Sequence, residues 1–238
     1  MISKIMNPKD GSPTNLSVKD IIGWDVVNWG RSLKFWSRFI DNKNRLKCLE
    51  LGSNKGGLSL WLAMKGNEVV CSDLEIPGEE TVIFHRKHNL TGKISYKKVN
   101  ALDIPYIDYF DVVIFKSILG GISRNHNDEL KKKTLDEINK ALKPGGVLLF
   151  AENLEASIVH KFFRKKYVKW GGNWNYLKLD ELDEMFLSYS KVEYITTGFC
   201  GAFGRNEFQR SILSRLDGIF ERFIPEKKRY IVIGAAIK

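Results

Sequence analysis

The sequence has few cysteines, no metal-binding cluster and no long hydrophobic run. Its three cysteines, Cys48, Cys71 and Cys200, are scattered and form no Cys-x-x-Cys pair, which argues against a disulfide framework or a redox site. No His-rich or paired-aspartate pattern predicts a metal. No apolar run approaches the roughly 18 residues that cross a bilayer, and residues 1–20 contain no apolar segment of the signal-peptide kind. These absences predict a cytoplasmic protein that neither spans a membrane nor is exported.

The chain does have enough apolar material for one sizeable core, and it has an excess of basic charge. Apolar residues make up 43% of the 238 residues, which favours a single globular domain. The net charge of +10 favours an anionic partner or acceptor. Because the basic residues are spread along the whole chain, solvated surface is the simpler explanation of this charge.

Short apolar runs alternate with stretches of helical period, which is the pattern of a parallel α/β sheet. Residues 58–65 and 128–142 repeat apolar side chains every three to four positions and predict helices that cover the sheet. The last two of seven predicted strands are expected to pair antiparallel. The strands are 46–51, 68–71, 95–99, 112–115, 147–150, 192–197 and 230–237.

Two regions outside the first five strands also predict helices. Residues 17–39 present an aromatic face, and we expect residues 1–45 to form a helical cap over the ligand edge of a domain that spans 46–238. Residues 155–169 and 179–189 predict further helices. Residues 207–223 predict an amphipathic helix docked on its own domain, the alternatives being a homodimer face and a membrane-surface contact.

A glycine-rich turn follows the first predicted strand in the segment from Leu49 to Gly57. Its glycines let the backbone approach a ligand closely and aim N–H groups at it. Glu50, just before the turn, would repel a pyrophosphate but suits a cationic ligand that carries an amino group and a sulfonium. Asp73 ends the second strand about 20 residues later, where a carboxylate accepts hydrogen bonds from ribose hydroxyls.

Two further elements complete an ordered set. The segment Asn100-Ala101-Leu102-Asp103 follows the third strand, and Leu142-Lys143-Pro144-Gly145-Gly146 precedes the fifth. With these motifs in this order, residues 46–152 resemble the class I S-adenosylmethionine-dependent methyltransferases. The resemblance implies a Rossmann-like, doubly wound α/β fold with seven strands, mostly parallel with an antiparallel last strand, and helices on both faces.

The same resemblance implies S-adenosylmethionine as cofactor, with Glu50 near its amino group and Asp73 on its ribose. Asn54 stands where the family has a central glycine, which is tolerable because asparagine enters the left-handed region readily. Asn100 stands where an acid commonly holds the adenine, so either its amide oxygen or Asp103 takes that role. The other implied cofactor residues are Gly52, Ser53, Gly56, Leu74, Ala101, Leu102, Lys116 and Ser117.

Methylation of a hydroxyl needs a base that removes its proton. His126, downstream of the predicted methyl site, is the first candidate, and its alternative is a surface histidine. Glu152, directly after the fifth strand, is the second, and its alternatives are a helix cap or an ion-pair partner. Both residues lie beyond the carboxyl ends of predicted strands, where catalytic groups of α/β proteins lie.

The acceptor pocket is expected to be walled by Trp24, Trp29, Arg31 and Trp174, although aromatic residues of this kind are often simply core. The leading hypothesis is O-methylation of a sugar, nucleotide-sugar or other small or glycan acceptor, as in methyltransferases of bacterial surface-polysaccharide biosynthesis. One alternative is an RNA methyltransferase that uses the basic and aromatic residues around 160–170. The other is a cofactor-binding partner protein without catalytic activity.

Overall fold

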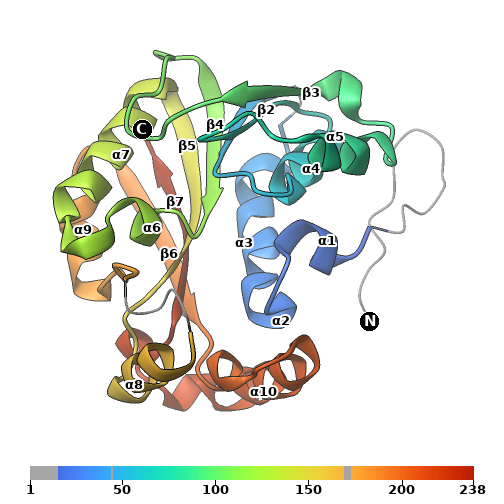
Figure 1. Cartoon of the computed structure of the whole chain (residues 1–238). Coiled ribbons are helices and arrows are strands. Elements are labelled where there is room, and N and C mark those ends of the chain that lie inside the picture. Colours follow the sequence, from blue (N-terminus) through green and yellow to red (C-terminus); the bar gives the residue numbers. More distant parts are fainter. Residues whose placement is uncertain (1–15, 44, 169–172) are drawn as a thin grey trace.

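A twisted seven-stranded sheet forms the centre of the computed structural model, which describes residues 16–43, 45–168 and 173–238 (Figure 1). Every strand is parallel to its neighbours except β7, which runs antiparallel to both β5 and β6. This arrangement confirms the predicted α/β fold with an antiparallel last strand. In spatial order the strands are β3 (Ile94–Lys98), β2 (Glu68–Asp73), β1 (Lys47–Leu51), β4 (Phe110–Lys116), β5 (Leu142–Asn153), β7 (Ile231–Ile237) and β6 (Lys191–Thr197).

Helices cover both faces of the sheet because its central strands are apolar on both sides. In β4, Val112 and Ile114 enter the core beneath α3 (Arg31–Ile40) and α4 (Gly57–Met64). Val113 and Phe115 point the other way, into the core beneath α7 (Asp128–Ala141) and α9 (Leu182–Met185). The alternation of side chains along a strand therefore gives the molecule two cores, one on each face.

The amino-terminal segment differs from the single helix predicted over 17–39. It forms α1 (Val18–Ile22), α2 (Val26–Trp29) and α3, because Gly23 and Asp25 take left-handed φ values of 90° and 46°. Ser17 begins α1 with a capping box to Asp20. α3 packs across the sheet, where Trp36 Nε1 donates to the Gly234 carbonyl at 3.1 Å. The division at residue 45 stays a prediction, and residues 1–15 lie outside the described residues.

The remaining helices lie at the loops and beyond β5. The helix predicted over 179–189 is only a short turn followed by α9. The segment from Leu142 to Gly146, expected to precede the fifth strand, is instead the first part of β5, where Gly145 takes φ +74°. The sequence pattern missed two helices, α5 (Glu79–Arg86) and α6 (Leu119–Ile122). The other elements are α8 (Ile158–Tyr167), α10 (Glu207–Phe220), η1 (Thr91–Lys93), η2 (Arg124–His126), η3 (Leu179–Glu181), η4 (Cys200–Phe203), η5 (Glu221–Phe223) and η6 (Glu226–Lys228).

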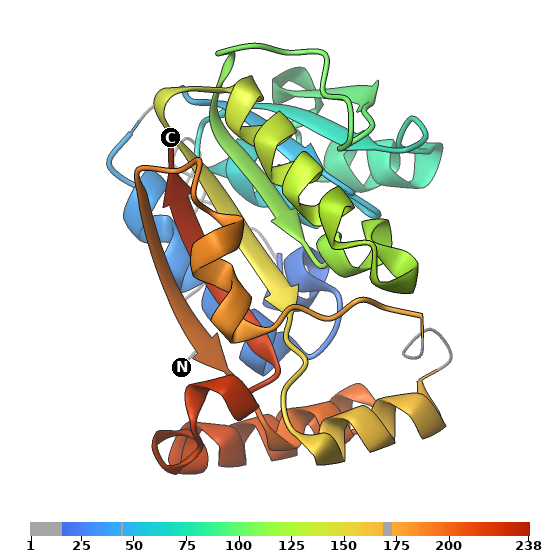
Figure 2. The same cartoon turned by 90° about the vertical axis from the view of Figure 1, so that its left-hand side faces the viewer.

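α8 and α10 lie together at one end of the molecule, beyond the carboxyl ends of β4 and β5, and both views show them side by side (Figures 1 and 2). Within the described ranges, no helix is long and apolar enough to cross a lipid bilayer.

Candidate active site

The turn between β1 and α4 is held in an unusual backbone conformation. Gly52, Asn54 and Gly56 have positive φ values of 63°, 48° and 73°. A Cβ at Gly52 would lie 2.6 Å from Ile118, and one at Gly56 would lie 2.6 Å from the His85 ring. Glycine is therefore required twice, and the prediction that asparagine tolerates the left-handed conformation at position 54 is confirmed.

Neighbouring side chains brace this turn from behind. His85 on α5 is buried, with Nε2 2.8 Å from the Gly56 carbonyl and Nδ1 2.9 Å from the Tyr96 hydroxyl. Thr81 Oγ1 donates to the Asn54 carbonyl at 3.2 Å. These contacts fix the turn before any ligand binds, so α5 acts as a support that the sequence pattern did not reveal.

Glu50 lies buried beneath the first turn of α4. Its Oε2 accepts hydrogen bonds from the Ser59 backbone N–H at 2.8 Å and from the Ser59 hydroxyl at 2.5 Å. Burial raises the pKa of Glu50 to about 7, against the lowering effect of the Ser59 hydrogen bonds. The carboxylate thus caps a helix and also borders the cavity described below, where a cationic group would favour its charged form.

Asp73 closes the turn from β2. Its Oδ2 accepts from the Asn54 backbone N–H at 3.0 Å, and its Oδ1 accepts from the Leu74 N–H at 2.8 Å. Each carboxylate oxygen retains a further lone pair, so accepting bonds from a ribose remains compatible with this geometry. The role of Asp73 on the ribose stays a prediction.

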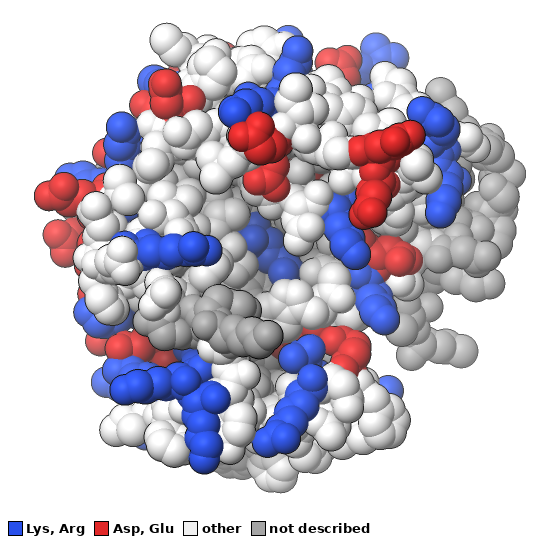
Figure 3. Space-filling model, viewed as in Figure 1, with Lys and Arg blue, Asp and Glu red and all other residues white. Residues whose placement is uncertain are grey.

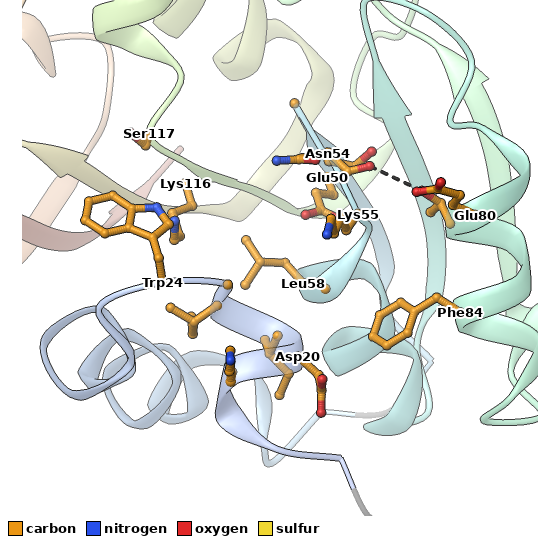
Figure 4. Close-up of a pocket in the computed structure, with 18 of the residues that line it drawn as sticks. Asp20, Trp24, Glu50, Asn54, Lys55, Leu58, Glu80, Phe84, Lys116 and Ser117 are labelled. Atoms are coloured by element: carbon orange, nitrogen blue, oxygen red, sulfur yellow. Dashed lines mark hydrogen bonds between the residues drawn. The ribbon is translucent and has the colours of Figure 1, made fainter. Parts of the chain in front are cut away.

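A cavity of about 770 Å³ extends from this turn to the carboxyl end of β4 (Figure 4). Its volume falls in the range of small-molecule sites, roughly 300 to 1,000 Å³. Of the predicted residues it is lined by Trp24, Glu50, Gly52, Ser53, Asn54, Lys116, Ser117 and Trp174. The sequence pattern missed the lining from α1 and α5, which includes Asp20, Ile21, Glu80 and Phe84, and also missed Arg124.

The predicted adenine residues lie outside this lining. Asn100 Oδ1 accepts from the Leu102 N–H at 3.0 Å and so closes a turn after β3, while Ala101 packs into the core. Leu74 is 62% exposed at the end of β2. The contacts of Asn100 and Ala101 with an adenine, and of Leu74 and Leu102 with the cofactor, remain predictions.

Lys116 lies at the end of β4, where the structure surrounds it with aromatic rings. Its Nζ is 4.6 Å from the centre of the Trp29 ring and 5.3 Å from that of Trp24. Burial lowers the pKa of Lys116 to about 8, although Glu152, Asp25 and Glu50 favour its charged form. Figure 4 shows it beside Trp24 on the cavity wall. The lysine can therefore change its protonation state near neutral pH.

Trp174 reaches the cavity because α6 offers it a surface without side chains. A Cβ at Gly120 would lie 2.0 Å from Trp174 Nε1, and one at Gly121 would lie 3.1 Å from its ring. The Asn175 N–H donates to the Gly120 carbonyl at 3.1 Å and holds the segment in place. The pair Gly120-Gly121 is a sequence signal for this close approach. The signal can be interpreted only once Trp174 is known to pack there.

The two predicted bases do not line the cavity. Glu152 is fully buried, and its carboxylate accepts from the backbone N–H groups of Leu119 and Asn153 at 2.8 and 3.0 Å. Burial raises the pKa of Glu152 to about 7. It therefore caps the start of α6, which is the alternative considered above. His126 is an exposed residue of η2 and lies outside the lining. Neither is placed to take a proton from a ligand in this cavity.

Two predicted acceptor residues also have structural roles. Trp29 is completely buried in the core behind Lys116, since sheet and cap close over it. Arg31 points toward β6, where its guanidinium pairs with Glu221 at 2.5 Å and donates to Thr197 Oγ1 at 2.6 Å. Neither Trp29 nor Arg31 lines this cavity, and their contact with an acceptor stays a prediction.

Comparison with known proteins gives one matching family model, the methyltransferase domain, over residues 49–150. Ubiquinone/menaquinone biosynthesis C-methyltransferase UbiE of Shewanella sp. (strain ANA-3) is 30% identical over 154 residues, which are 60% of this chain and 57% of that protein. UbiE of Proteus mirabilis is 31% identical over 140 residues, covering 54% and 52% of the two chains. The chain thus spans somewhat more than half the length of the relatives it matches.

Solved structures share the fold at low sequence identity. Haemonchus contortus phosphoethanolamine N-methyltransferase 2, in complex with S-adenosyl-L-methionine, aligns with a TM-score of 0.62 at 18% identity, over 88% of this chain and 52% of that chain. The YcgJ protein of Bacillus subtilis aligns with a TM-score of 0.60 at 14% identity, over 88% and 98% of the two chains. The family match over residues 49–150, the strand order and the glycine-rich turn with its acidic neighbours together show that this chain contains a methyltransferase domain of the class I, S-adenosylmethionine-dependent type.

Proposed function

We propose that this protein transfers a methyl group from S-adenosylmethionine to a small anionic acceptor that binds between Trp24, Trp174 and Lys116. The observation that carries the proposal is the cavity of about 770 Å³, which joins the glycine-rich turn to this aromatic and basic wall. S-adenosylmethionine supplies an activated methyl group on a sulfonium. The described residues around the cavity supply binding, orientation and a group that can hold a proton.

The turn end of the cavity suits the cofactor. Gly52 leaves its backbone open to close approach, Glu50 provides a negative charge for an amino group, and Asp73 lies at the adjoining strand end. Ser53 Oγ is buried and has no hydrogen-bond partner among the described residues, so a bound ligand would satisfy it. A buried acid and an unsatisfied hydroxyl at one glycine-lined surface support this assignment.

The other end of the cavity suits a ring-shaped acceptor with negative charge. Trp24 and Trp174 offer aromatic faces, and Lys116 and Arg124 offer positive charge. A sugar phosphate or nucleotide-sugar has both features, which supports O-methylation of such an acceptor, including a glycan precursor of a cell-surface polysaccharide. A cytoplasmic location is part of this proposal.

We further propose that Lys116, in place of His126 and Glu152, takes the proton of the acceptor hydroxyl. It is the cavity-lining group with a pKa of about 8, so a substantial fraction is neutral at slightly alkaline pH. The neighbouring indoles of Trp24 and Trp29, whose planes are tilted by 55°, hold its amine at the carboxyl end of β4. In its charged form the same amine attracts an anionic acceptor.

A second candidate is methylation of a carbon on an electron-rich phenol. It is favoured by the relatives that are about 30% identical and carry the name C-methyltransferase. Removal of a phenolic proton by Lys116 and stacking on Trp24 would serve that reaction equally. Methylation of RNA, and cofactor binding without turnover, are the remaining alternatives.

The test has two stages. Calorimetric titration with S-adenosylmethionine and S-adenosylhomocysteine is expected to show binding of both, and folded protein that binds neither would contradict the proposal. Transfer of labelled methyl is then measured to nucleotide-sugars, sugar phosphates, isoprenoid phenols and RNA. Labelling of an alkali-stable ether on a sugar supports O-methylation, labelling of a phenol ring carbon supports the second candidate, and labelling of RNA alone would overturn both.

A further inference from the structure

α10 is an amphipathic helix whose apolar stripe faces outward. Phe208, Ile212, Leu216, Ile219 and Phe223 recur at helical spacing and are 75%, 47%, 39%, 59% and 70% exposed. Such a stripe normally faces the core of its own domain. The helix predicted over 207–223 does dock on its own domain, but through a polar face.

The inward face of α10 is held by hydrogen bonds rather than by apolar packing. Ser214 Oγ accepts from Asn28 Nδ2 at 2.9 Å and donates to Asp25 at 3.0 Å. Asp217 accepts from the backbone N–H groups of Cys200 and Gly201 at 2.6 and 3.0 Å. These bonds fix the orientation of the helix, so the outward apolar stripe is a defined part of the fold.

α8 lies beside α10 and repeats this arrangement. Its inward residues are the polar His160 and Arg164, while Ile158 and Phe162 are 82% and 65% exposed. At one end of α8, Arg205 lies 5.1 Å from the Tyr167 ring. At the other end, Ile158 shares a hollow of about 430 Å³ with Lys227 and Lys228. The two helices thus form one continuous surface, seen at the lower end of the molecule in Figures 1 and 2.

The exposed charges of residues 205–228 are almost all positive, while the hollow beside Lys227 and Lys228 is also lined by Glu155 and Asp180. Between positions 205 and 228 the exposed basic residues are Arg205, Arg215, Arg222, Lys227 and Lys228, against the exposed acid Glu226. The other acids of the segment are bonded inward: Glu207 accepts from the N–H groups of Asp25 and Val26, and Glu221 pairs with Arg31. Figure 3 shows basic side chains gathered over this end of the molecule.

From this combination we propose that the α8–α10 surface, comprising α8 and residues 205–228, binds the face of an anionic lipid membrane. Apolar side chains between arginines and lysines are the pattern by which amphipathic helices lie in a membrane interface, with apolar groups among the acyl chains and basic groups at the phosphates. The surface adjoins the cavity, because Arg210 of α10 lies 5.5 Å from the Trp24 ring. The proposal is independent of which acceptor is methylated.

Charge and side-chain type favour a membrane over other occupants. A second copy of the chain would bring the same five basic residues against themselves, and like charges oppose such contact. RNA offers phosphates, and its bases can stack on Phe162, Phe208 and Phe223, but the equally exposed aliphatic side chains of Ile158, Ile212 and Ile219 offer no flat face for a base. In a membrane, acyl chains can contact the apolar side chains of this surface while lipid phosphates pair with its basic residues.

The experiment is sedimentation of the full chain with vesicles of phosphatidylglycerol and phosphatidylcholine, compared with phosphatidylcholine alone. We expect binding to the anionic vesicles that weakens as salt rises. The double variants Phe208→Ser with Phe223→Ser, and Arg215→Glu with Lys228→Glu, are each expected to weaken binding about tenfold or more. The matched control, Ile107→Ser with Lys132→Glu, alters an equally exposed apolar and basic pair on other elements and is expected to bind as the unaltered chain does.

Three results would overturn the proposal. The first is no sedimentation with anionic vesicles, and the second is equal loss of binding in the control variant. The third is that the chain dimerises as its concentration rises, or binds RNA and not vesicles, and that Phe208→Ser with Phe223→Ser abolishes this behaviour. Because Phe208 and Phe223 are largely exposed, their replacement is expected to leave the folded structure intact, which circular dichroism checks.

Discussion

At the scale of single residues, the cavity is lined by two ionisable groups of opposite sign, the buried Glu50 and the half-buried Lys116. Burial raises the pKa of Glu50 to about 7 and lowers that of Lys116 to about 8. Both shifts arise because the surroundings disfavour the charged form. They bring the pKa values of an acid and a base, which ordinarily lie far apart, close to neutral pH. Paired shifts of this kind in one cavity are typical of functional sites.

The first prediction concerns Glu50 and cofactor affinity. A protonated Glu50 no longer attracts an ammonium group, so affinity for S-adenosylmethionine is expected to fall as pH falls through about 7. Glu50→Gln is expected to bind about tenfold more weakly at pH 8 and to show a flatter pH dependence. Calorimetry at pH 6, 7 and 8 measures both effects. Glu68→Gln, at an exposed position of β2, is the control, and an unchanged profile in Glu50→Gln would contradict the assignment.

The second prediction concerns Lys116 and the pH dependence of turnover. Because only the neutral amine accepts a proton, kcat is expected to rise as pH increases through about 8. Lys116→Arg keeps the charge but cannot lose it, so we expect it to reduce kcat about a hundredfold and remove this rise. Lys132→Arg on the exposed side of α7 serves as the control. If Lys116→Arg stays fully active, the lysine serves only as a positive charge.

At the scale of elements, short helices position the groups around the cavity. α6 begins over the Glu152 carboxylate, and its two glycines form the surface that receives Trp174. α5 supports the glycine-rich turn through His85, and α1 closes the cavity from the amino-terminal side. Helices of four to eight residues have too few periods to be recognised by pattern, which explains why α5 and α6 were not predicted.

The third prediction follows from the contact between α6 and Trp174. Gly120→Ala places a methyl group where the indole lies, so Trp174 must move away from the acceptor end of the cavity. We expect kcat/KM for the acceptor to fall about tenfold while affinity for S-adenosylmethionine is retained, as measured by steady-state kinetics and calorimetry. Gly92→Ala, where an added Cβ meets open space, is the matched control. If Gly120→Ala weakened the binding of S-adenosylmethionine as much as it lowered kcat/KM, Trp174 would not act on the acceptor alone.

At the scale of the whole molecule, a buried polar network joins the two ends of the chain. Asn28 Nδ2 lies 2.9 Å from Ser214 Oγ, Asp217 Oδ2 and the Tyr230 hydroxyl, and Asp25 also bonds to Tyr230. Burial raises the pKa of Asp25. The network connects α2, α10 and the start of β7, so the amino-terminal helices are integrated with the sheet at the end where α10 lies.

The fourth prediction tests this network. Asn28→Ala removes the buried Nδ2 donor to Ser214, Asp217 and the Tyr230 hydroxyl, which is expected to lower the free energy of unfolding by about 2 to 3 kcal/mol. Urea unfolding followed by tryptophan fluorescence measures the change. The control Asn42→Ala, at an exposed position after α3, is expected to change the free energy of unfolding by less than about 0.5 kcal/mol. A similar small effect in Asn28→Ala would show that the network contributes little to stability.

The sequence alone determined where the strands lie along the chain, the glycine-rich turn and the carboxylates at Glu50 and Asp73, because these depend on local periodicity and on the conformations that glycine and asparagine allow. Only the tertiary structure decided which groups meet. Lys116 became the candidate base, in place of His126 and Glu152, because residues far apart in the chain bury it under Trp24 and Trp29. α10 turned its apolar stripe outward because its polar face found partners in α2 and η4. Burial and long-range pairing are properties of the folded chain, and no local pattern contains them.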